Sequence, residues 1–470
     1  MEKVAFTTLG CRLNQAESDS MAEDLATQGI EAAAVDESPD LVVINTCTVT
    51  REATKASRQA IRRAVKHNPG AKVVVIGCYA VSNPEEIEAI EGVDAILSND
   101  DKENFLEALR PSLGSGQAHP DSLRSGQAHP NSLRSGQAHP ARPAPLLQVG
   151  MRGSTKPSLP YRVRANLKAQ TGCDEWCSFC IIPTTRGPLR SLEEDGLVAE
   201  AEAKVRAGAR EIVLTGVHLG KYRYDQGGDE RDLIRLMRRI LDIEGLWRLR
   251  LSSILSQHLT DEVIDFIANE PRVCRFLHVP LQAGDDEVLI AMNRPYDIEG
   301  FLDSVTRATD RIEGLALATD IIVGFPGETE EAFERTMDVV RKVRFSKLHV
   351  FRYSERPDTA AAAMHQQELP GDVKRDRSKR LIRLGNDIRS EFLDDHIGRE
   401  LEVLVEEERA VDGATISSGQ TSDFVRVWFE RGSENSLLGQ MAIVEGVRVR
   451  ADGLEGRLPA KSLSSKGDLW

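Results

Sequence analysis

Short apolar runs alternate with longer amphipathic stretches through the first part of the chain. Three of the runs are rich in β-branched residues and are typical of buried strands in parallel sheets: residues 4–9, 41–44 and 72–76. Amphipathic stretches at residues 14–28, 51–67 and 84–91 predict the helices between them. This alternation predicts a doubly wound α/β domain with a parallel sheet over residues 1–110.

The same alternation returns further along the chain and continues for six rounds. Strands are expected at residues 162–168, 211–215, 248–254, 276–281, 318–323 and 347–351, with helices such as 197–207, 233–241, 262–268 and 333–343 between them. A right-handed run of βα units curls into a barrel or part of one, and its working face lies at the carboxyl ends of the strands. We expect a partial (β/α)6 barrel of the TIM type over residues 155–396.

From about residue 397 the pattern changes to short strands with turn residues between them. Residues 401–405, 424–429, 441–444 and 447–449 predict a small antiparallel β-barrel over residues 397–470. Small β-barrels bind single-stranded nucleic acid through exposed aromatic and basic side chains. A capping module without RNA contact is the alternative.

Between the two α/β regions the chain repeats a ten-residue unit. The unit begins Ser-Gly-Gln-Ala-His-Pro and occurs in full from Ser115 and from Ser125, and its first six residues recur from Ser135. It is too short for a solenoid repeat and has no apolar face, so residues 111–150 are expected to form a flexible linker. His119, His129 and His139 recur with the repeat and are expected to be solvated rather than to bind metal.

Composition agrees with several globular domains in one chain. The 470 residues are 40% hydrophobic and 29% charged. No stretch approaches the ~18 apolar residues of a membrane span, and no apolar signal segment follows Met1. We therefore expect a cytosolic (cytoplasmic) protein without membrane contact. In that reducing compartment its seven cysteines are expected to serve metal binding or catalysis rather than disulfides.

Three of these cysteines lie in one short loop after the first predicted barrel strand. Three residues separate Cys173 from Cys177, and two separate Cys177 from Cys180. Structural zinc sites are closed by four ligands, whereas no further Cys or His follows nearby here. Because thiolates also hold iron–sulfur clusters, the spacing favours a cluster with one uncapped iron. A zinc-dependent RNA-binding protein without catalysis is the alternative from a different class.

Three other cysteines each follow a predicted strand of the first domain. They are Cys11, Cys47 and Cys78. Open α/β sheets bind ligands at the edge formed by the carboxyl ends of their strands. We interpret these residues as a second three-thiolate cluster site, the alternative being unrelated core cysteines. Cys274 has no such neighbours and is expected to be a buried, inert thiol.

The predicted helix after Cys47 carries basic residues at spacings of three and four, which places them on one face. They are Arg51, Lys55, Arg58, Arg62 and Lys66. The formal net charge of −14 disfavours a polyanionic partner, but a basic stripe beside a catalytic edge can form a phosphate track. We expect these residues to contact RNA, the alternative being a solvated helix face.

The cysteine loop carries a resemblance to a known family. The run Cys177-Ser-Phe-Cys-Ile-Ile-Pro-Thr-Thr-Arg-Gly187, which follows Cys173, resembles the methylthiotransferase branch of the radical S-adenosylmethionine superfamily. Gly284 in Val-Pro-Leu-Gln-Ala-Gly-Asp-Asp and the run Thr-Asp-Ile-Ile-Val-Gly-Phe-Pro-Gly-Glu-Thr from Thr319 also fit. The first domain resembles the accessory domain of that branch. The C-terminal β domain, with Gly-Gln-Thr-Ser-Asp-Phe424, resembles its RNA-binding TRAM domain.

The resemblance implies two 4Fe–4S clusters, with S-adenosylmethionine as the further cofactor. The cluster ligands would be Cys11, Cys47 and Cys78 in the first domain, and Cys173, Cys177 and Cys180 in the barrel. The barrel cluster would cleave S-adenosylmethionine to a 5′-deoxyadenosyl radical, which is chemistry that ordinary acids and bases cannot perform. The other cluster would deliver a methylated sulfur. No catalytic residue beyond the cluster ligands is expected.

The expected partners follow from the same resemblance. They are the tRNA anticodon stem-loop and a reductant such as flavodoxin or ferredoxin, and the sulfur donor is unknown. Residues at the ends of the barrel strands are expected to line the cofactor pocket: Thr215, Gly216, Arg250, Ser252, Ser253, Gln282 and Gly324. A structural role is the alternative for each of them. After Ser253 the chain has Ile-Leu-Ser256 where relatives are expected to have Ile-Glu-Pro.

The run Gly10-Cys-Arg-Leu-Asn-Gln-Ala-Glu-Ser18 is most similar to the branch that acts on threonylcarbamoyladenosine in tRNA. We therefore expect methylthiolation at C2 of N6-threonylcarbamoyladenosine beside the anticodon. Methylthiolation of isopentenyladenosine in tRNA is the runner-up. A third branch acts on an aspartate of a ribosomal protein.

Overall fold

The computed structural model of the chain describes residues 1–114, 162–431 and 435–459. Apart from residues 111–114, the predicted linker with its three histidines lies outside the described residues. Contacts within the chain define two units. The first comprises Met1–Tyr161, Asn166–Asp174 and Cys180–Ala203, and the second comprises Arg162–Ala165, Glu175–Phe179 and Lys204–Trp470. In the described ranges, no helix is both long enough and apolar enough to cross a membrane.

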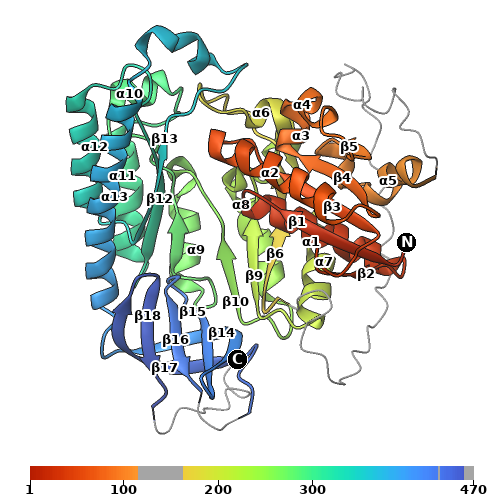
Figure 1. Cartoon of the computed structure of the whole chain (residues 1–470). Coiled ribbons are helices and arrows are strands. Elements are labelled where there is room, and N and C mark those ends of the chain that lie inside the picture. The colour runs from red at the N-terminus through yellow and green to blue at the C-terminus, as the bar shows by residue number, and fades with distance from the viewer. Residues whose placement is uncertain (115–161, 432–434, 460–470) are drawn as a thin grey trace. The chain divides into compact units, whose positions relative to one another are not determined.

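The first unit is built on a five-stranded parallel sheet of order β2-β1-β3-β4-β5 (Figure 1). Its strands are β1 (Lys3–Thr8), β2 (Glu31–Ala32), β3 (Leu41–Thr46), β4 (Lys72–Gly77) and β5 (Ala95–Leu97). Its helices include α1 (Arg12–Thr27), α2 (Arg51–His67), α3 (Cys78–Ser82), α4 (Pro84–Glu88), η1 (Asp100–Lys102) and α5 (Phe105–Gly114). The predicted α/β alternation is confirmed.

The segments around the cysteine loop add four short elements to this unit. They are β7 (Gln170–Thr171), α6 (Ile182–Arg186), β8 (Arg190–Ser191) and most of α7 (Glu194–Arg206). Strands β7 and β8 pair antiparallel, and α6 packs against α3. The first unit therefore contains more than the N-terminal domain expected from the sequence.

Apolar side chains cover both faces of the five-stranded sheet. All residues of β3 are buried, and successive strand side chains point to opposite faces. Val43 belongs to the same core cluster as Leu25 of α1, whereas Ile44 belongs to the cluster of Ile61 of α2. The doubly wound arrangement follows, because helices must cover both apolar faces.

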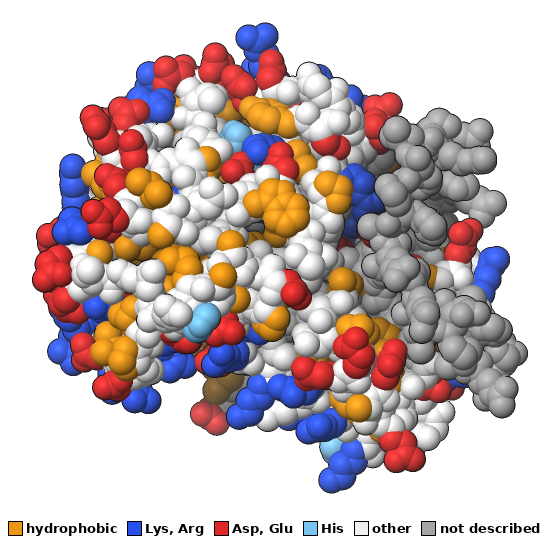
Figure 2. Space-filling model, turned by 90° about the horizontal axis from the view of Figure 1, so that it is seen from above, with side chains coloured by type: hydrophobic (Ala, Val, Ile, Leu, Met, Phe, Trp, Pro, Cys, Tyr) orange, Lys and Arg blue, Asp and Glu red, His pale blue; other side chains and the backbone are white. Residues whose placement is uncertain are grey.

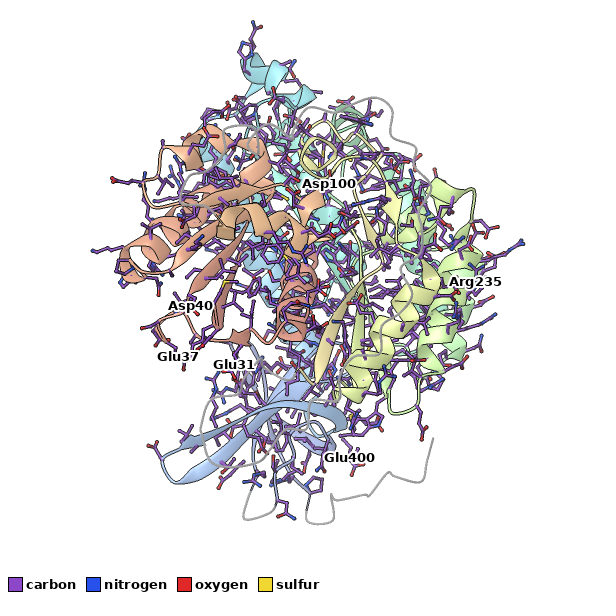
Figure 3. All side chains as sticks on the ribbon, turned by 90° about the vertical axis from the view of Figure 1, so that its right-hand side faces the viewer. Glu31, Glu37, Asp40, Asp100, Arg235 and Glu400 are labelled. Carbon is purple, nitrogen blue, oxygen red and sulfur yellow. The ribbon has the colours of Figure 1, made fainter. Side chains whose placement is uncertain are left out.

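Asp40, labelled in Figure 3, closes the amino edge of the sheet just before β3. Its carboxylate accepts hydrogen bonds from the backbone N–H groups of Glu2 and Lys3, at 2.6 and 3.0 Å. These two bonds lower the pKa of Asp40. Structural contacts thus secure the amino edge, and the cysteines lie at the opposite, carboxyl edge.

The barrel region contributes six strands in chain order. They are β6 (Arg164–Lys168), β9 (Glu211–Thr215), β10 (Arg248–Leu251), β11 (Phe276–His278), β12 (Ala316–Val323) and β13 (Lys347–Arg352). They form sheets of order β10-β9-β6 and β11-β12-β13, and a parallel bridge from Leu249 to Val273 lies between these sheets. Among the intervening helices are α8 (Glu230–Leu241), α9 (Asp261–Asn269), α10 (Asp286–Ala291), α11 (Ile298–Arg311) and α12 (Glu330–Val343), and α13 (Gly371–Asp394) follows the last strand. This arrangement fits a partial βα barrel.

The C-terminal strands close into a small barrel of order β14-β15-β16-β18-β17 (Figure 1, blue). They are β14 (Glu400–Val411), β15 (Ala414–Gln420), β16 (Arg426–Glu430), β17 (Met441–Arg450) and β18 (Gly453–Arg457). The predicted small β-barrel is present, and its pairing is mixed rather than antiparallel throughout, because β16 and β18 pair in parallel. An odd number of strands cannot close with every neighbouring pair antiparallel. Val403, Val427 and Leu454 lie in its core.

A buried carboxylate joins the barrel strands to the C-terminal barrel. Glu211 on β9 pairs with Arg248 and Arg250 of β10, at 2.6 and 2.7 Å. Arg250 also donates to the backbone carbonyls of Thr421 and Ser422, at 3.0 and 2.9 Å. Burial alone would raise the pKa of Glu211, but the arginines lower it far below its usual range.

A second pair connects the end of α13 to the C-terminal barrel. His396 Nε2 lies 2.6 Å from Asp423 Oδ2. Burial alone would lower the pKa of His396, but Asp423 raises it above its ordinary value. Because the pKa is raised in the folded state, the pair stabilises fully below about pH 6.5, the unfolded value. This stabilisation is lost as the pH rises through the folded pKa.

We expect the C-terminal barrel to become less stable as the pH rises above about 6.5 and through the raised pKa of His396. The measurement is the thermal unfolding midpoint of the full chain, assigned to this barrel by hydrogen exchange of β14 to β18. His396→Gln should flatten this pH dependence, because glutamine does not titrate. Identical pH profiles in the two proteins would show that the pair contributes nothing.

Candidate active site

Cys11, Cys47 and Cys78 lie at the carboxyl edge of the first sheet. Thr46 pairs with Gly77 in the register of β3 and β4, and each is followed directly by a cysteine. Cys11 comes two residues after Leu9, whose backbone N–H donates to Asn45 of β3. The structure therefore brings the three residues to neighbouring strand ends, as the sequence predicted.

Two glycines allow this close approach. Gly10 has a φ of +96°, and a Cβ built there would lie 2.7 Å from Cys47 Cβ and 2.9 Å from its Sγ. Gly77 has a φ of +107°, and a Cβ there would lie 2.5 Å from the carbonyl oxygen of Thr46. Any side chain at either position would clash and would need an unfavourable backbone conformation. These glycines let the backbone before Cys11 and Cys78 pass close to its neighbours.

The three thiols influence one another electrostatically. Burial raises the pKa of Cys47 to about 11, with further contributions from the charges of Cys78 and Cys11. All three cysteines are free, with Cys47 and Cys78 buried and Cys11 exposed. A site of this kind favours a positively charged occupant that would stabilise three thiolates.

Polar side chains brace the loops that carry these cysteines. Asn14 Nδ2 donates to the carbonyls of Leu9 and Thr46, at 2.7 and 3.0 Å. Ser57 Oγ accepts from the backbone N–H of Cys47 at 3.1 Å and donates to its carbonyl at 2.9 Å. The backbone at two of the strand ends is thus held from α1 and α2.

A buried ion cluster lies beside the same edge. Glu17 of α1 pairs with Lys102 at 2.5 Å and with Arg186 at 2.7 Å, and all three side chains are at most 2% exposed. Burial alone would raise the pKa of Glu17, but the two cations lower it far below its usual range. Burial alone would lower the pKa of Arg186, whereas Cys78, Glu17 and Cys11 raise it.

This ion cluster fits cysteines that carry negative charge as thiolates. Among the three buried side chains, Lys102 and Arg186 carry two positive charges and Glu17 carries one negative charge, and Lys168 adds a further positive charge 3.9 Å from Glu17. At least one positive charge is therefore left beside Cys78 and Cys11, whose charges raise the pKa of Arg186. A buried charge needs a partner, and three thiolates of an iron–sulfur cluster would supply it. The residues present thus fit such a cluster.

The second cysteine set is divided between the two units. Cys173 and Cys180 belong to the first unit and Cys177 to the second. The backbone N–H of Cys173 donates to the carbonyl of Gly187 at 3.2 Å, and Cys180 Sγ accepts from the N–H of Ile182 at 3.4 Å. In the second unit, Cys177 is buried and its Sγ accepts from Arg294 at 3.1 Å. None of the three forms a disulfide with another described residue.

Most of the predicted cofactor residues lie at the carboxyl ends of barrel strands. Thr215 ends β9 and Gly216 follows it, and Ser252 and Ser253 follow β10. Ser252 Oγ is buried without a hydrogen-bond partner among the described residues. Such an orphaned hydroxyl fits a site completed by a bound group.

Gln282 and Gly324 follow β11 and β12, respectively. Gln282 has a φ of +67°, which is unusual for a residue with a side chain. A Cβ at Gly324 would lie 2.2 Å from Cγ of Lys374. The backbone N–H of Gly324 donates to the carboxylate of Glu328. Close packing against Lys374 therefore explains why a glycine stands at position 324.

Arg250 was expected to line the cofactor pocket, and in the structure its side chain contacts a buried carboxylate. Its guanidinium is fully buried and bonded to Glu211 and to the carbonyls of Thr421 and Ser422. The alternation of side chains along β10 places Arg250 on the same face as Arg248. Both arginines hold the buried carboxylate.

The structure also shows where Cys274 and the basic residues of α2 lie. Cys274 is buried with 1% of its surface exposed, as expected. The basic residues of α2 lie beside its buried face, and all except Arg58 are exposed: Arg51, Lys55, Arg62 and Lys66. Arg58 pairs with Glu86 of α4 at 3.0 Å. Lys and Arg side chains also lie among Asp and Glu on the face shown in Figure 2.

Sequence reasoning missed Glu17, Lys102 and Arg186 as members of the first site. One signal was present in α1. Asn14 and Glu17 are three residues apart and share a face with buried Met21, so polar residues interrupt an otherwise apolar helix face. Lys102 and Arg186 come from distant parts of the chain, and no local pattern indicates their burial.

Family models agree with the geometry of both cysteine sets. Residues 3–98 match a model described as uncharacterized protein family UPF0004, and residues 167–340 match the radical SAM superfamily. The first match contains Cys11, Cys47 and Cys78, and the second contains the cysteine loop. Together they define the class, a radical S-adenosylmethionine protein with a second cysteine-bearing domain.

Similarity to characterised relatives extends over nearly the whole chain. A threonylcarbamoyladenosine tRNA methylthiotransferase from Bacillus subtilis is 37% identical over 447 residues, which cover 95% of this chain and 94% of the relative. A tRNA-2-methylthio-N(6)-dimethylallyladenosine synthase from Clostridioides difficile is 32% identical over 465 residues, covering 97% and 91%. The chain therefore belongs to the radical S-adenosylmethionine methylthiotransferase family.

A solved structure supports the fold. The radical S-adenosylmethionine methyltransferase TsrM from Kitasatospora setae is similar with a TM-score of 0.54 and 17% identity. The similarity covers 77% of this chain and 74% of that one. At this level of identity the likeness concerns the fold alone.

Proposed function

We propose that this protein methylthiolates C2 of N6-threonylcarbamoyladenosine beside the anticodon of tRNA, using two 4Fe–4S clusters and S-adenosylmethionine. The observation that carries the proposal is the doubling of three-cysteine sets at strand ends, in a chain of this family. A radical enzyme needs one such set. The second set gives the transferred sulfur a place to bind.

Cys11, Cys47 and Cys78 would hold the first cluster. Lys102 and Arg186 offset its negative charge, and the glycines before Cys11 and Cys78 admit it to the sheet edge. When bound, this cluster supplies an open iron at which a sulfur can be methylated and from which it can be transferred.

Cys173, Cys177 and Cys180 would hold the second cluster. When bound, it supplies the electron that cleaves S-adenosylmethionine and so starts hydrogen removal from the substrate carbon. Thr215, Ser252 and Gln282 would orient the cofactor from the ends of β9, β10 and β11. The role of these three residues is positioning, because their side chains are neutral at pH 7.

The RNA would contact two basic surfaces, each within its own unit. The first is the stripe of α2 described above. The second lies on the C-terminal barrel, where the guanidinium carbons of Arg426 and Arg450 lie 5.4 and 5.0 Å from the ring centroid of Trp428. Aromatic rings flanked by arginines suit the stacking of unpaired bases. Cytoplasmic tRNA is the substrate, and flavodoxin or ferredoxin is the expected reductant.

The experiment that tests this function compares tRNA from a strain with and without the gene. In the strain without the gene, mass spectrometry of the nucleosides should show that the 2-methylthio derivative of threonylcarbamoyladenosine is lost. Threonylcarbamoyladenosine without the methylthio group should accumulate. Restoring the gene on a plasmid should restore the product. Loss of methylthio-isopentenyladenosine instead would support the runner-up activity, methylthiolation of isopentenyladenosine. The similarity to the synthase from Clostridioides difficile is the observation in favour of that activity.

Iron content separates the proposed enzyme from a zinc-binding RNA protein. Anaerobically purified protein should be brown and contain iron and sulfide. A colourless protein that contained zinc at both cysteine sets would contradict the radical function.

A further inference from the structure

The loop that carries Cys177 is contacted by a half-buried arginine from a distant part of the second unit. Arg294, which follows α10, donates from Nη1 to Sγ of Cys177 across 3.1 Å. Cys177 is 9% exposed. A cationic donor at this distance from a sulfur forms a charge-assisted hydrogen bond. Neither the sequence pattern nor the family match assigned a role to this arginine.

Tyr296 fixes the position of the guanidinium. Arg294 Nε donates to Tyr296 Oη at 3.1 Å, and its guanidinium carbon lies 4.8 Å from the ring centroid. The tyrosine hydroxyl donates to the carbonyl of Pro280 at 2.7 Å, with that of Leu281 at 3.1 Å. These contacts tie the arginine to the chain after β11.

The second terminal nitrogen of Arg294, Nη2, is a further hydrogen-bond donor. This atom is buried and has no hydrogen-bond partner among the described residues. Leaving a buried donor unsatisfied is costly, and more so for a charged group. A complete site would therefore place an anionic acceptor beside this nitrogen. A thiolate-bound iron–sulfur cluster at Cys177 offers such acceptors in its sulfur atoms.

We propose that Arg294 is a positioning residue for the barrel cluster, donating to the Cys177 sulfur and raising the reduction potential of the cluster. Reduction adds negative charge to the cluster, and a nearby positive charge stabilises the more negative state. Hydrogen bonds to the sulfurs are an established means by which proteins set such potentials. The inference rests on the proposed function, since it takes Cys177 as a cluster ligand.

The test measures the midpoint potential of the barrel cluster alone. Full-length protein with Cys11, Cys47 and Cys78 each changed to Ala serves as the parent, so that the remaining cluster is the one at the loop. Arg294→Met, Arg294→Lys and Tyr296→Phe are added to it, and each protein is reconstituted and titrated anaerobically by electron paramagnetic resonance. S-adenosylmethionine is left out, so that changes in its binding do not enter.

Arg294→Met should shift the reduction equilibrium about tenfold towards the oxidised cluster, which is about 59 mV for a one-electron couple. Arg294→Lys should shift it less in the same direction, because the charge stays while the fork of donors is lost. Tyr296→Phe keeps the guanidinium and should give the smallest shift. Iron content and circular dichroism establish that each variant is folded and loaded.

Unchanged midpoints in Arg294→Met and Arg294→Lys, with full iron content, would overturn the inference and leave the proposed function standing. If Arg294→Met lost its iron, Arg294→Lys would decide: a lowered midpoint supports the inference and an unchanged one overturns it. A parent protein that bound no cluster at all would instead contradict the proposed function.

Discussion

Cys177→Ala should abolish both cleavage of S-adenosylmethionine and formation of the methylthio product, whereas Cys47→Ala should abolish the product alone. The first change removes a ligand from the barrel cluster, on which radical formation depends. The second removes a ligand from the other cluster, and the two sets are carried by different strands and loops. Each lost activity should fall by at least about a thousandfold, to background, because the cofactor supplies the chemistry.

The measurement is chromatography of 5′-deoxyadenosine together with mass spectrometry of the RNA product. Cys274→Ala provides a matched control, since this cysteine is buried, free and distant in sequence from both sets. It should keep both activities. A folded Cys47→Ala protein that retained its barrel cluster but no longer cleaved S-adenosylmethionine would contradict this division of labour.

Glu17→Gln should destabilise the first unit by about 3 kcal/mol, the lower end of the range for a broken buried pair. The change leaves Lys102 and Arg186 buried without their carboxylate. The loss is limited because Lys102, whose pKa burial already lowers, can release its proton. Urea unfolding of the cluster-free protein, followed by hydrogen exchange of α1, measures the effect.

Two controls separate the buried charge from a general effect of the substitution. Glu103→Gln removes a carboxylate from the same unit that pairs with Arg190, which is 45% exposed, and at 3.5 Å with Lys168; because Glu103 itself is 27% exposed, the cost should stay below about 1 kcal/mol. Glu17→Gln combined with Lys102→Met should recover part of the stability, because one buried positive charge is removed with the negative one. Equal losses in the Glu17 and Glu103 variants would contradict the account of the buried ion cluster.

The low pKa of Glu17 also fixes the sign of a pH effect. Its folded pKa lies below the unfolded value of about 4.3. The stabilisation is therefore present above about pH 4.3 and is lost as the pH falls towards the folded pKa. Glu17→Gln should remove this part of the acid sensitivity of the first unit.

The order of strands and helices could be predicted from the sequence because apolar runs of period two and helical faces of period 3.6 are local signals. The three cysteines of the first site were found by the same means, since Cys11, Cys47 and Cys78 each follow a recognisable strand. Their convergence then follows from the parallel pairing of β1, β3 and β4. A local pattern and one topological rule were sufficient here.

The charged partners of the sites could not be predicted in this way. Arg186 is buried beside Glu17, 169 residues away in sequence, and Arg294 reaches Cys177 across 117 residues. Such pairs are set by tertiary packing, and a charged residue in a loop usually indicates solvent exposure. Arg250 is a related case, because its place near a strand end gave no sign of the buried carboxylate that it binds.

Methylthiolation of defined RNAs in vitro distinguishes the two candidate substrates. Reconstituted protein is incubated anaerobically with S-adenosylmethionine, a strong reductant and two anticodon stem-loops, one carrying threonylcarbamoyladenosine and the other isopentenyladenosine. We expect a mass increase of one methylthio group on the threonylcarbamoyladenosine RNA, with 5′-deoxyadenosine formed alongside. Methylthiolation of the isopentenyladenosine RNA alone, or 5′-deoxyadenosine formation with no methylthio product on either RNA, would contradict the proposed function.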